Sequence, residues 1–350
     1  MFYESTRDRN RKINPSEAIL QGLSEEGGLF VLRDLGEKKI DLNNLIDKNY
    51  YQVAEAILKL FVDFTDEEIK NCVENAYRGK FSHEKITPLV ELSDGYVLEL
   101  FNGPTSAFKD VALTLLPYLI QLALEGTEQE ILILTATSGD TGKAALEGFK
   151  DVPGTHIQVF FPTDGVSLMQ QEQMQKQEGA NVNVTAIEGN FDDAQQFLKR
   201  LFVDTDVAKE VADKGVKFSS ANSINIGRLA PQVVYYVAAY AELVNTGAIH
   251  EDEAFNVVVP TGNFGNILAA YYAKRMGIPV GKLICASNQN NVLADFFSTG
   301  TYDMNRPFYT TISPSMDILE SSNFERFIYY VSGENAELKA ERMKALKAEG

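Results

Sequence analysis

The sequence has few residues that could hold a metal ion. Its 350 residues include two cysteines, Cys72 and Cys285, and three histidines, His83, His156 and His250. No histidine lies near a cysteine or another histidine in the sequence, which argues against a zinc site and against a Ser-His-Asp triad. We therefore expect no bound metal, and we expect both cysteines to be buried thiols in a reducing compartment.

Positive charge and long apolar runs are also scarce. The formal net charge is −17, with 32 Lys and Arg against 49 Asp and Glu. Without a basic patch, we expect no nucleic-acid binding. No run of about 18 apolar residues occurs, and the start of the chain lacks the apolar stretch of a signal peptide. We therefore expect a cytoplasmic protein without a membrane span.

The order of apolar segments predicts an α/β protein. Helix-period apolar residues occur early in the chain, at Pro15–Leu23, Leu42–Phe61 and Asp66–Arg78. From Ile131 onward, apolar strands alternate with helices, which implies a parallel sheet covered on both faces. We predict an N-terminal, mainly helical region (1–95) followed by an α/β core (96–350), in which a smaller subdomain (about 131–205) is inserted into a larger domain (96–130 and 206–350).

One lysine lies where a loop meets a helix. The segment Phe101–Asp110, Phe-Asn-Gly-Pro-Thr-Ser-Ala-Phe-Lys-Asp, places Lys109 before an expected helix at Val111–Leu124. Because a helix N-terminus carries partial positive charge, we expect the pKa of Lys109 to be lowered. A neutral amine is what Schiff-base chemistry requires. On these ten residues alone, a surface lysine beside an N-capping aspartate is a slightly better explanation.

A glycine-bearing segment, Thr135–Gly142, follows an apolar strand, where parallel sheets bind ligands. Its sequence, Thr-Ala-Thr-Ser-Gly-Asp-Thr-Gly, could form an anion site from backbone N–H groups and the hydroxyls of Thr137, Ser138 and Thr141. It is not a Walker A motif, because Thr137 stands where a glycine is needed and Ala144 where serine or threonine is needed. We therefore do not expect an ATPase.

Two further segments also lead into helices. Pro260–Asn266, Pro-Thr-Gly-Asn-Phe-Gly-Asn, has small residues that let a backbone approach a phosphate, and the helix dipole would attract that phosphate. It lacks the full G-x-G-x-x-G pattern, so dinucleotide binding is weakly supported. Ser220–Arg228 precedes a long helix, where Arg228 could meet a substrate phosphate. A solvated helix arginine is the alternative explanation.

Together, the lysine segment, the Ser-Gly-Asp-Thr-Gly segment and the Gly-Asn-Phe-Gly-Asn segment resemble the pyridoxal-phosphate (PLP) enzymes of the tryptophan-synthase β family, and the threonine synthases in particular. The resemblance covers essentially the whole chain and extends to other segments: Tyr3–Arg7, Glu17–Leu23, Gly27–Leu29 and Ser322–Arg326. It implies the PLP-dependent fold type II, with two α/β domains and a helical N-terminal region.

The resemblance also implies roles for individual residues, with Lys109 as the Schiff-base lysine. The implied cofactor-binding residues are Lys109, Phe108, Asp140, Gly262, Asn263, Phe264, Gly265 and Asn266. The implied substrate-binding residues are Thr105, Thr137, Ser138, Gly139, Thr141, Asn222, Asn225 and Arg228. Asp140 would face the phenolic oxygen of the cofactor, and N-capping of its own helix is an equally good explanation for that residue.

The implied reaction converts O-phospho-L-homoserine and water to L-threonine and phosphate, with Lys109 as the proton shuttle. Two alternatives stay open: a dehydratase or cysteine-synthase-like enzyme of the same fold, and a non-catalytic ligand-binding relative. Threonine synthases normally continue past the length of this chain, and we expect the residue that meets the pyridine nitrogen in that further segment. We expect a monomer or a homodimer.

Overall fold

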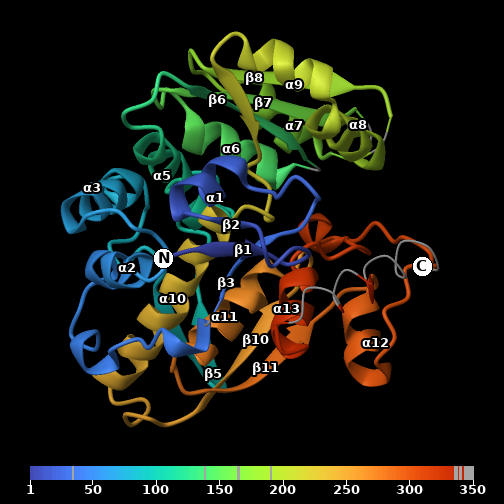
Figure 1. The fold of residues 1–350 in the computed structure, drawn as a ribbon. Coiled ribbons are helices and arrows are strands. Elements are labelled where there is room, and N and C mark those ends of the chain that lie inside the picture. Colours follow the sequence, from blue (N-terminus) through green and yellow to red (C-terminus); the bar gives the residue numbers. More distant parts are fainter. Residues whose placement is uncertain are drawn as a thin grey trace.

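The computed structural model describes residues 1–33, 35–137, 139–163, 166–189, 191–334, 338 and 341–342. Two lobes are visible in Figure 1. The upper lobe contains a four-stranded sheet, and the lower lobe is built around one long helix, α10 (Ile226–Asn245). Among the described residues, no helix combines the length and apolar character needed to cross a membrane.

The sheet of the upper lobe is parallel, as the alternation of strands and helices predicts. Its strand order is β8-β7-β6-β9, and these strands are β6 (Glu130–Ala136), β7 (Thr155–Pro162), β8 (Val182–Ile187) and β9 (Val216–Ser219). The helices between them are α6 (Asp140–Phe149), α7 (Leu168–Gln175), α8 (Phe191–Val203) and α9 (Thr205–Ala212). Strand β9 lies beyond residue 205, so the sheet extends past the predicted boundary of the smaller subdomain.

Helix α10 is buried along most of its length. It packs against α2 (Tyr50–Leu58), α4 (Asp110–Leu113) and α11 (Gly265–Arg275). Helix α11 in turn packs against a parallel pair of strands, β10 (Phe255–Pro260) and β11 (Val280–Ala286). Two more helices follow, α12 (Val292–Thr299) and α13 (Phe324–Val331), with the short 3-10 turn η3 (Pro314–Met316) between them.

The N-terminal region contains a sheet that the sequence did not predict. Strands β1 (Tyr3–Ser5), β2 (Lys12–Ile13) and β3 (Phe30–Leu32) form an antiparallel sheet, and β4 (Leu89–Leu92) pairs with β5 (Gly95–Leu98). The helices here are α1 (Pro15–Gln21), α2, and α3 (Asp66–Tyr77), with 3-10 turns η1 (Leu35–Glu37) and η2 (Leu42–Asn44). The description of residues 1–95 as mainly helical was therefore incomplete.

The expected helix at Leu42–Phe61 is wrong in its first part. Asn49 starts α2 instead, because its side chain accepts a hydrogen bond from the amide of Gln52, and the side chain of Gln52 accepts one from the amide of Asn49. This reciprocal pair satisfies amides that a helix N-terminus leaves unpaired. Helix α2 therefore begins at Tyr50, and only a 3-10 turn precedes it.

Two segments from opposite ends of the chain meet in the fold. Arg7 donates to both carboxylate oxygens of Glu325, at 2.9 and 2.8 Å, and the Thr6 hydroxyl donates to one of them at 2.6 Å. The fully buried Arg326 donates to the backbone carbonyls of Phe30 and Ile224. These contacts fix α13 against the N-terminal sheet, beside the start of α10.

Candidate functional site

The loop before Lys109 is folded by the next residue in the chain. The Asp110 carboxylate accepts hydrogen bonds from the Thr105 amide at 2.8 Å and from the Thr105 hydroxyl at 2.6 Å. Gly103 allows this close approach, since a Cβ there would lie 2.4 Å from the Asp110 Cβ. Thr105 thus shapes the loop that carries Lys109.

The expected helix at Val111–Leu124 is interrupted. It is divided into α4 and α5 (Leu116–Ala123), and Pro117 lies in the first turn of α5, where proline is tolerated because the amide there needs no helical partner. Because α4 has only 4 residues, the helix dipole contributes less to the Lys109 pKa than the sequence argument assumed. The pKa of Lys109 is lowered, as expected, but burial of the amine is the main cause.

Lys109 is 9% exposed, so the surface-lysine explanation is wrong. Its Nζ lies 2.8 Å from both carboxylate oxygens of Asp140. Ser315 donates from its Oγ to Oδ2 of the same carboxylate at 2.5 Å. Burial alone would raise the pKa of the Asp140 carboxyl, but the charge and hydrogen bonds of Lys109, with that of Ser315, hold it below its usual value. The amine and the carboxylate therefore form a buried pair.

The segment before Asp140 is held by one hydroxyl. Thr137 Oγ1 accepts hydrogen bonds from the amides of Gly139 and Gly142, both at 2.9 Å, and Thr137 is 1% exposed. Gly139 has φ +141°, a conformation that favours glycine. These amides were predicted to bind an anion, but here they bond within the loop. Asp140 is the first residue of α6, and Gly139 rather than Asp140 is the N-cap.

The predicted anion site also included Ser138 and Thr141. Ser138 lies outside the described residues. Thr141 is half-buried, and its amide donates to Oδ1 of Asp140 at 2.8 Å.

The second glycine segment leaves backbone amides unpaired. Within the part of the chain that the structure describes, the amides of Gly262, Asn263 and Phe264 donate no hydrogen bond. Phe264 has φ +63° and is the N-cap of α11, an 11-residue helix. Unpaired amides at a helix N-terminus form an anion site. This backbone arrangement fits the phosphate group of a cofactor.

Side chains fix this second segment from two directions. The Phe264 ring is 3% exposed and packs against Phe324 and Phe327. Oδ1 of Asn266 accepts hydrogen bonds from the hydroxyls of Tyr235 at 2.6 Å and Tyr236 at 2.5 Å. Gly265 begins α11, where a Cβ would lie 3.3 Å from the Asn323 side chain. The helix start is therefore rigidly placed against α10 and α13.

Arg228 is 3% exposed, so the solvated-arginine explanation is wrong. Its Nη1 donates to the Ala221 carbonyl at 2.8 Å, whereas its Nε has no hydrogen-bond partner among the described residues. Burial lowers the pKa of Arg228 to about 10, and the nearby Asp140 carboxylate opposes this shift. The charge of Arg228 also lowers the pKa of Lys109. A buried cation with an unpaired N–H can receive an anionic group.

The two asparagines before Arg228 differ in whether their side chains have a free hydrogen-bonding group. Asn225 caps α10 by accepting from the Gly227 amide at 2.8 Å, and its amide group donates to the carbonyls of Ile19 and Ser220. Its side chain therefore has no free donor for a substrate. Asn222 is half-buried and keeps its side-chain amide unbonded within the described chain.

Sequence reasoning missed Ser315. It comes from the loop between α12 and α13 and is separated from Asp140 by 175 residues. The surrounding Ser313-Pro-Ser-Met-Asp317 carries no periodic or glycine-rich signal. Only its polar, turn-forming composition could have drawn attention to it.

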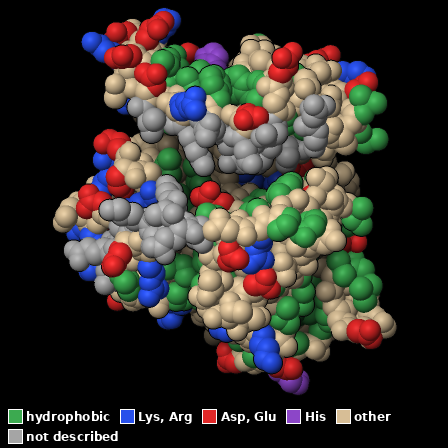
Figure 2. All heavy atoms as spheres, turned by 90° about the vertical axis from the view of Figure 1, so that its right-hand side faces the viewer, with side chains coloured by type: hydrophobic (Ala, Val, Ile, Leu, Met, Phe, Trp, Pro, Cys, Tyr) green, Lys and Arg blue, Asp and Glu red, His purple; other side chains and the backbone are tan. Residues whose placement is uncertain are grey.

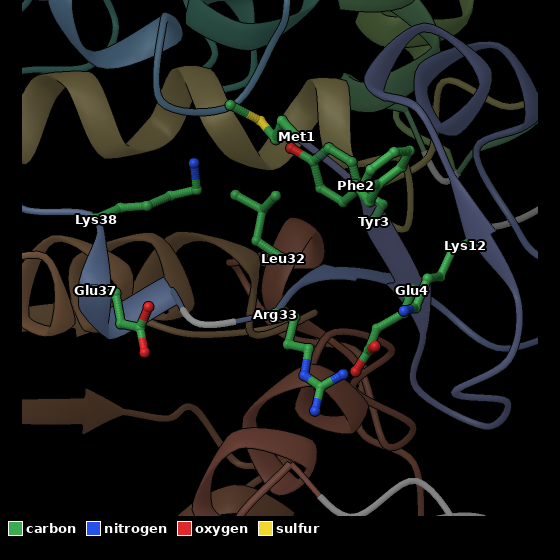
Figure 3. Close-up of a pocket in the computed structure, with 9 residues that line it drawn as sticks. All are labelled: Met1, Phe2, Tyr3, Glu4, Lys12, Leu32, Arg33, Glu37 and Lys38. Atoms are coloured by element: carbon green, nitrogen blue, oxygen red, sulfur yellow. The ribbon is translucent and has the colours of Figure 1, made fainter.

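Two cavities have linings that include neither Lys109 nor Asp140. One, of about 540 Å³, lies against the N-terminal sheet and includes Arg33, Glu37 and Lys38 among its lining residues (Figure 3). None of the residues predicted for the site lines it. The other, of about 420 Å³, is an apolar groove whose lining includes Phe264 and Cys285. Cys285 is only half-buried, and Cys72 is buried as predicted. Among the described residues, no cluster of His, Cys, Asp and Glu could hold a metal.

Comparison with known families defines the class of protein. A model described as "Pyridoxal-phosphate dependent enzyme" matches residues 80–342, and one described as "Threonine synthase N terminus" matches residues 2–77. The chain is therefore a member of the PLP-dependent enzymes.

Individual relatives show which family of PLP-dependent enzymes the chain resembles. Threonine synthase of Pseudomonas aeruginosa is 40% identical over 354 residues, covering 100% of this chain and 73% of that protein. A PLP-bound threonine synthase structure from Brucella melitensis has a TM-score of 0.91 at 40% identity, covering 100% and 74% of the two chains. The yeast structure has a TM-score of 0.86 at 34% identity, covering 98% and 70%. Within the PLP-dependent enzymes, the chain belongs to the threonine synthase family, which confirms the resemblance and the fold type.

Longer relatives also match. Threonine synthase-like 1 of Mus musculus is 41% identical over 348 residues, covering 95% of this chain and 46% of that protein. The chain thus spans about half the length of the threonine synthase-like 1 relatives.

Proposed function

We propose that the chain is a threonine synthase, which uses PLP to convert O-phospho-L-homoserine and water to L-threonine and phosphate. The observation that carries the proposal is the buried Lys109 amine, 2.8 Å from the Asp140 carboxylate and electrostatically coupled to Arg228. An amine with a lowered pKa can act as a nucleophile and then as a proton carrier. Membership of the threonine synthase family supports the choice of reaction.

The residues present fit PLP. The unpaired amides of Gly262, Asn263 and Phe264, at the start of α11, would hold its phosphate, with Gly265 and Asn266 continuing that turn. Lys109 would hold its aldehyde carbon. The Phe108 ring lies beside the Lys109 amine, with 5.6 Å between the ring centre and Nζ. Asp140 would face the same end of the cofactor as the amine. When bound, PLP supplies an electron sink for negative charge at the substrate Cα.

The rest of the reaction requires proton transfer and charge neutralisation. Lys109 would move protons at Cα and Cβ of the substrate. Arg228 would bind the phosphate of the substrate through its unpaired N–H. Thr141 and Asn222 would contact the rest of the substrate. Three residues shape the loops that carry these groups, namely Thr105, Thr137 and Asn225, and Gly139 allows the turn before Asp140.

Substitution of Lys109 tests this proposal directly. Lys109→Ala should abolish both the yellow chromophore of the PLP-loaded protein and the release of phosphate from O-phospho-L-homoserine. Lys176→Ala is the matched control, because Lys176, the C-cap of α7, is an exposed lysine whose amine pairs with Glu172 rather than with a residue of the described site. A Lys109→Ala protein that keeps its colour and its turnover would refute the role of Lys109.

Arg228 provides a separate test of the substrate assignment. Arg228→Ala should raise KM for O-phospho-L-homoserine by about 100-fold, because a charged hydrogen-bonding partner of the phosphate would be lost. PLP affinity should change much less. Unchanged substrate kinetics would remove Arg228 from the substrate site.

We further propose a cytoplasmic enzyme that acts as a monomer or homodimer and binds no nucleic acid. The acidic composition and two free thiols support this location. On the face drawn in Figure 2, acidic and basic side chains are interspersed, in keeping with a surface that does not bind a polyanion.

A further inference from the structure

A serine from a distant loop reaches the Lys109–Asp140 pair. Oδ2 of Asp140 accepts from Ser315 Oγ at 2.5 Å and from Lys109 Nζ at 2.8 Å. Oδ1 of Asp140 accepts from Lys109 Nζ and from the Thr141 amide, both at 2.8 Å. Ser315 is therefore the one hydroxyl bonded to this carboxylate among the described residues.

The loop that carries Ser315 is braced. The Asp317 carboxylate accepts hydrogen bonds from the Thr311 amide at 2.8 Å and from the Thr311 hydroxyl at 2.7 Å. It also accepts from the side-chain amides of Asn288 at 2.7 Å and Asn290 at 3.1 Å. These bonds join the loop to the segment that follows β11. The hydroxyl of Ser315 is thus presented by a fixed turn.

The same loop lies directly on the predicted phosphate segment. A Cβ on Gly262 would lie 3.1 Å from the Ser315 carbonyl oxygen and 3.2 Å from the Met316 Cα. Gly262 therefore permits the loop to pack closely on its backbone. Through Ser315, the loop connects the Gly262 segment of the lower lobe to Asp140 at the start of α6 in the upper lobe.

We propose that Ser315 is a positioning residue of the active site, whose hydroxyl holds the Asp140 carboxylate and takes up part of its negative charge. The proposal rests on the proposed role of Lys109. A carboxylate that accepts a strong hydrogen bond attracts a neighbouring proton less. Ser315 thereby reduces the stabilisation of the Lys109 ammonium by Asp140, and the neutral amine is available at lower pH.

The other charges around the pair do not replace this contribution. Arg228, on α10, interacts with both Lys109 and Asp140, and its positive charge opposes protonation of the amine. Without the Ser315 hydroxyl, the only described donors to the Asp140 carboxylate are the Lys109 amine and the Thr141 amide. More of its charge then acts on Lys109, because Arg228 makes no hydrogen bond to this carboxylate.

The test measures the amine itself, in the cofactor-free protein. Competitive acetylation across about pH 6 to pH 11, followed by mass spectrometry of the Lys109 peptide, gives the pH at which the amine becomes reactive. In Ser315→Ala this midpoint should rise by about 0.5–1 pH unit, which is a roughly threefold to tenfold smaller neutral fraction at lower pH. Ser315→Thr, which keeps the hydroxyl, should restore the original midpoint.

Two controls and one further variant make the test specific. The midpoint of the exposed Lys176 should be the same in all variants, and equal thermal melting temperatures would show that the fold is intact. Ser315→Cys, with a much weaker donor of similar size, should give an intermediate shift.

Identical Lys109 midpoints in wild type and Ser315→Ala would overturn the proposal, as would a fall in the midpoint, since that would mean that the carboxylate had turned away. Because no turnover is measured, this outcome is independent of whether the protein makes threonine.

Discussion

Gly148 sets the distance between two helices next to the Lys109–Asp140 pair. It lies in α6, which begins at Asp140, and packs against α4, which follows Lys109. A Cβ on Gly148 would lie 2.0 Å from the Leu113 carbonyl oxygen and 2.8 Å from its carbonyl carbon. Gly148→Ala therefore requires the two helix backbones to separate.

The size of this effect follows from the geometry. Ordinary van der Waals contact begins at 3.4 Å, so the helices must separate by about 1.4 Å. Overpacking of this kind lowers the free energy of unfolding by about 1–3 kcal/mol. The higher helix propensity of alanine offsets up to about 1 kcal/mol of this loss. We expect the free energy of unfolding to fall by about 1–2 kcal/mol. A shift of 1.4 Å would also stretch the 2.8 Å contacts between Lys109 and Asp140 beyond hydrogen-bond range.

Two assays check this prediction. Urea unfolding should show a lower midpoint for Gly148→Ala, and titration with PLP should show at least a tenfold weaker affinity, which is about 1.4 kcal/mol. Gly36→Ala is the control, because the atoms nearest to a Cβ there belong to the flexible Arg275 guanidinium, the first of them at 3.2 Å. If Gly148→Ala matched wild type in both stability and PLP affinity, the close packing of α4 on α6 would not set the site geometry.

Three other predictions concern stability and reactivity. Glu325→Ala should lower the free energy of unfolding by about 3 kcal/mol, because Arg7 loses its partly buried partner; an unchanged melting temperature would contradict this. Asn225→Ala should lower the free energy of unfolding by about 1–2 kcal/mol, because the cap of α10 is lost, and should leave KM unchanged. A raised KM without a loss of stability would show instead that Asn225 contacts the substrate. Burial raises the pKa of Cys72 to about 12, so its reactive thiolate appears only as the pH rises toward that value. A disulfide reagent at about pH 8 should therefore modify the half-buried Cys285 first. Faster modification of Cys72 would show that Cys72 is exposed.

Local patterns in the sequence were enough to predict several parts of the structure. The alternation of apolar strands with helices predicted the parallel strands β6 to β8, because period and length are local properties. The start of α11 after Phe264 was also predictable, since glycine and small polar residues mark strand-to-helix turns. Helix α6 begins at Asp140, two residues before the expected start at Gly142. Lys109 was singled out by the resemblance of its segment and the two glycine segments to a known family, since its own segment alone favoured a surface lysine slightly.

Features that depend on distant residues were not predictable in this way. Nothing local shows that Ser315 reaches Asp140, or that Arg7 reaches Glu325 across 318 residues. Strands β1 to β3 are each only 2 or 3 residues long and become strands only by pairing with one another. The lowered pKa of Lys109 was expected from a helix dipole but results mainly from burial, which depends on the whole fold.

Product analysis tests the central claim most directly. The purified chain is mixed with PLP and O-phospho-L-homoserine, and inorganic phosphate is measured together with the amino acid formed. We expect equal amounts of phosphate and L-threonine, with neither formed by Lys109→Ala. Release of phosphate with a keto acid in place of threonine, or no release of phosphate by a PLP-loaded yellow protein, would contradict threonine synthase activity.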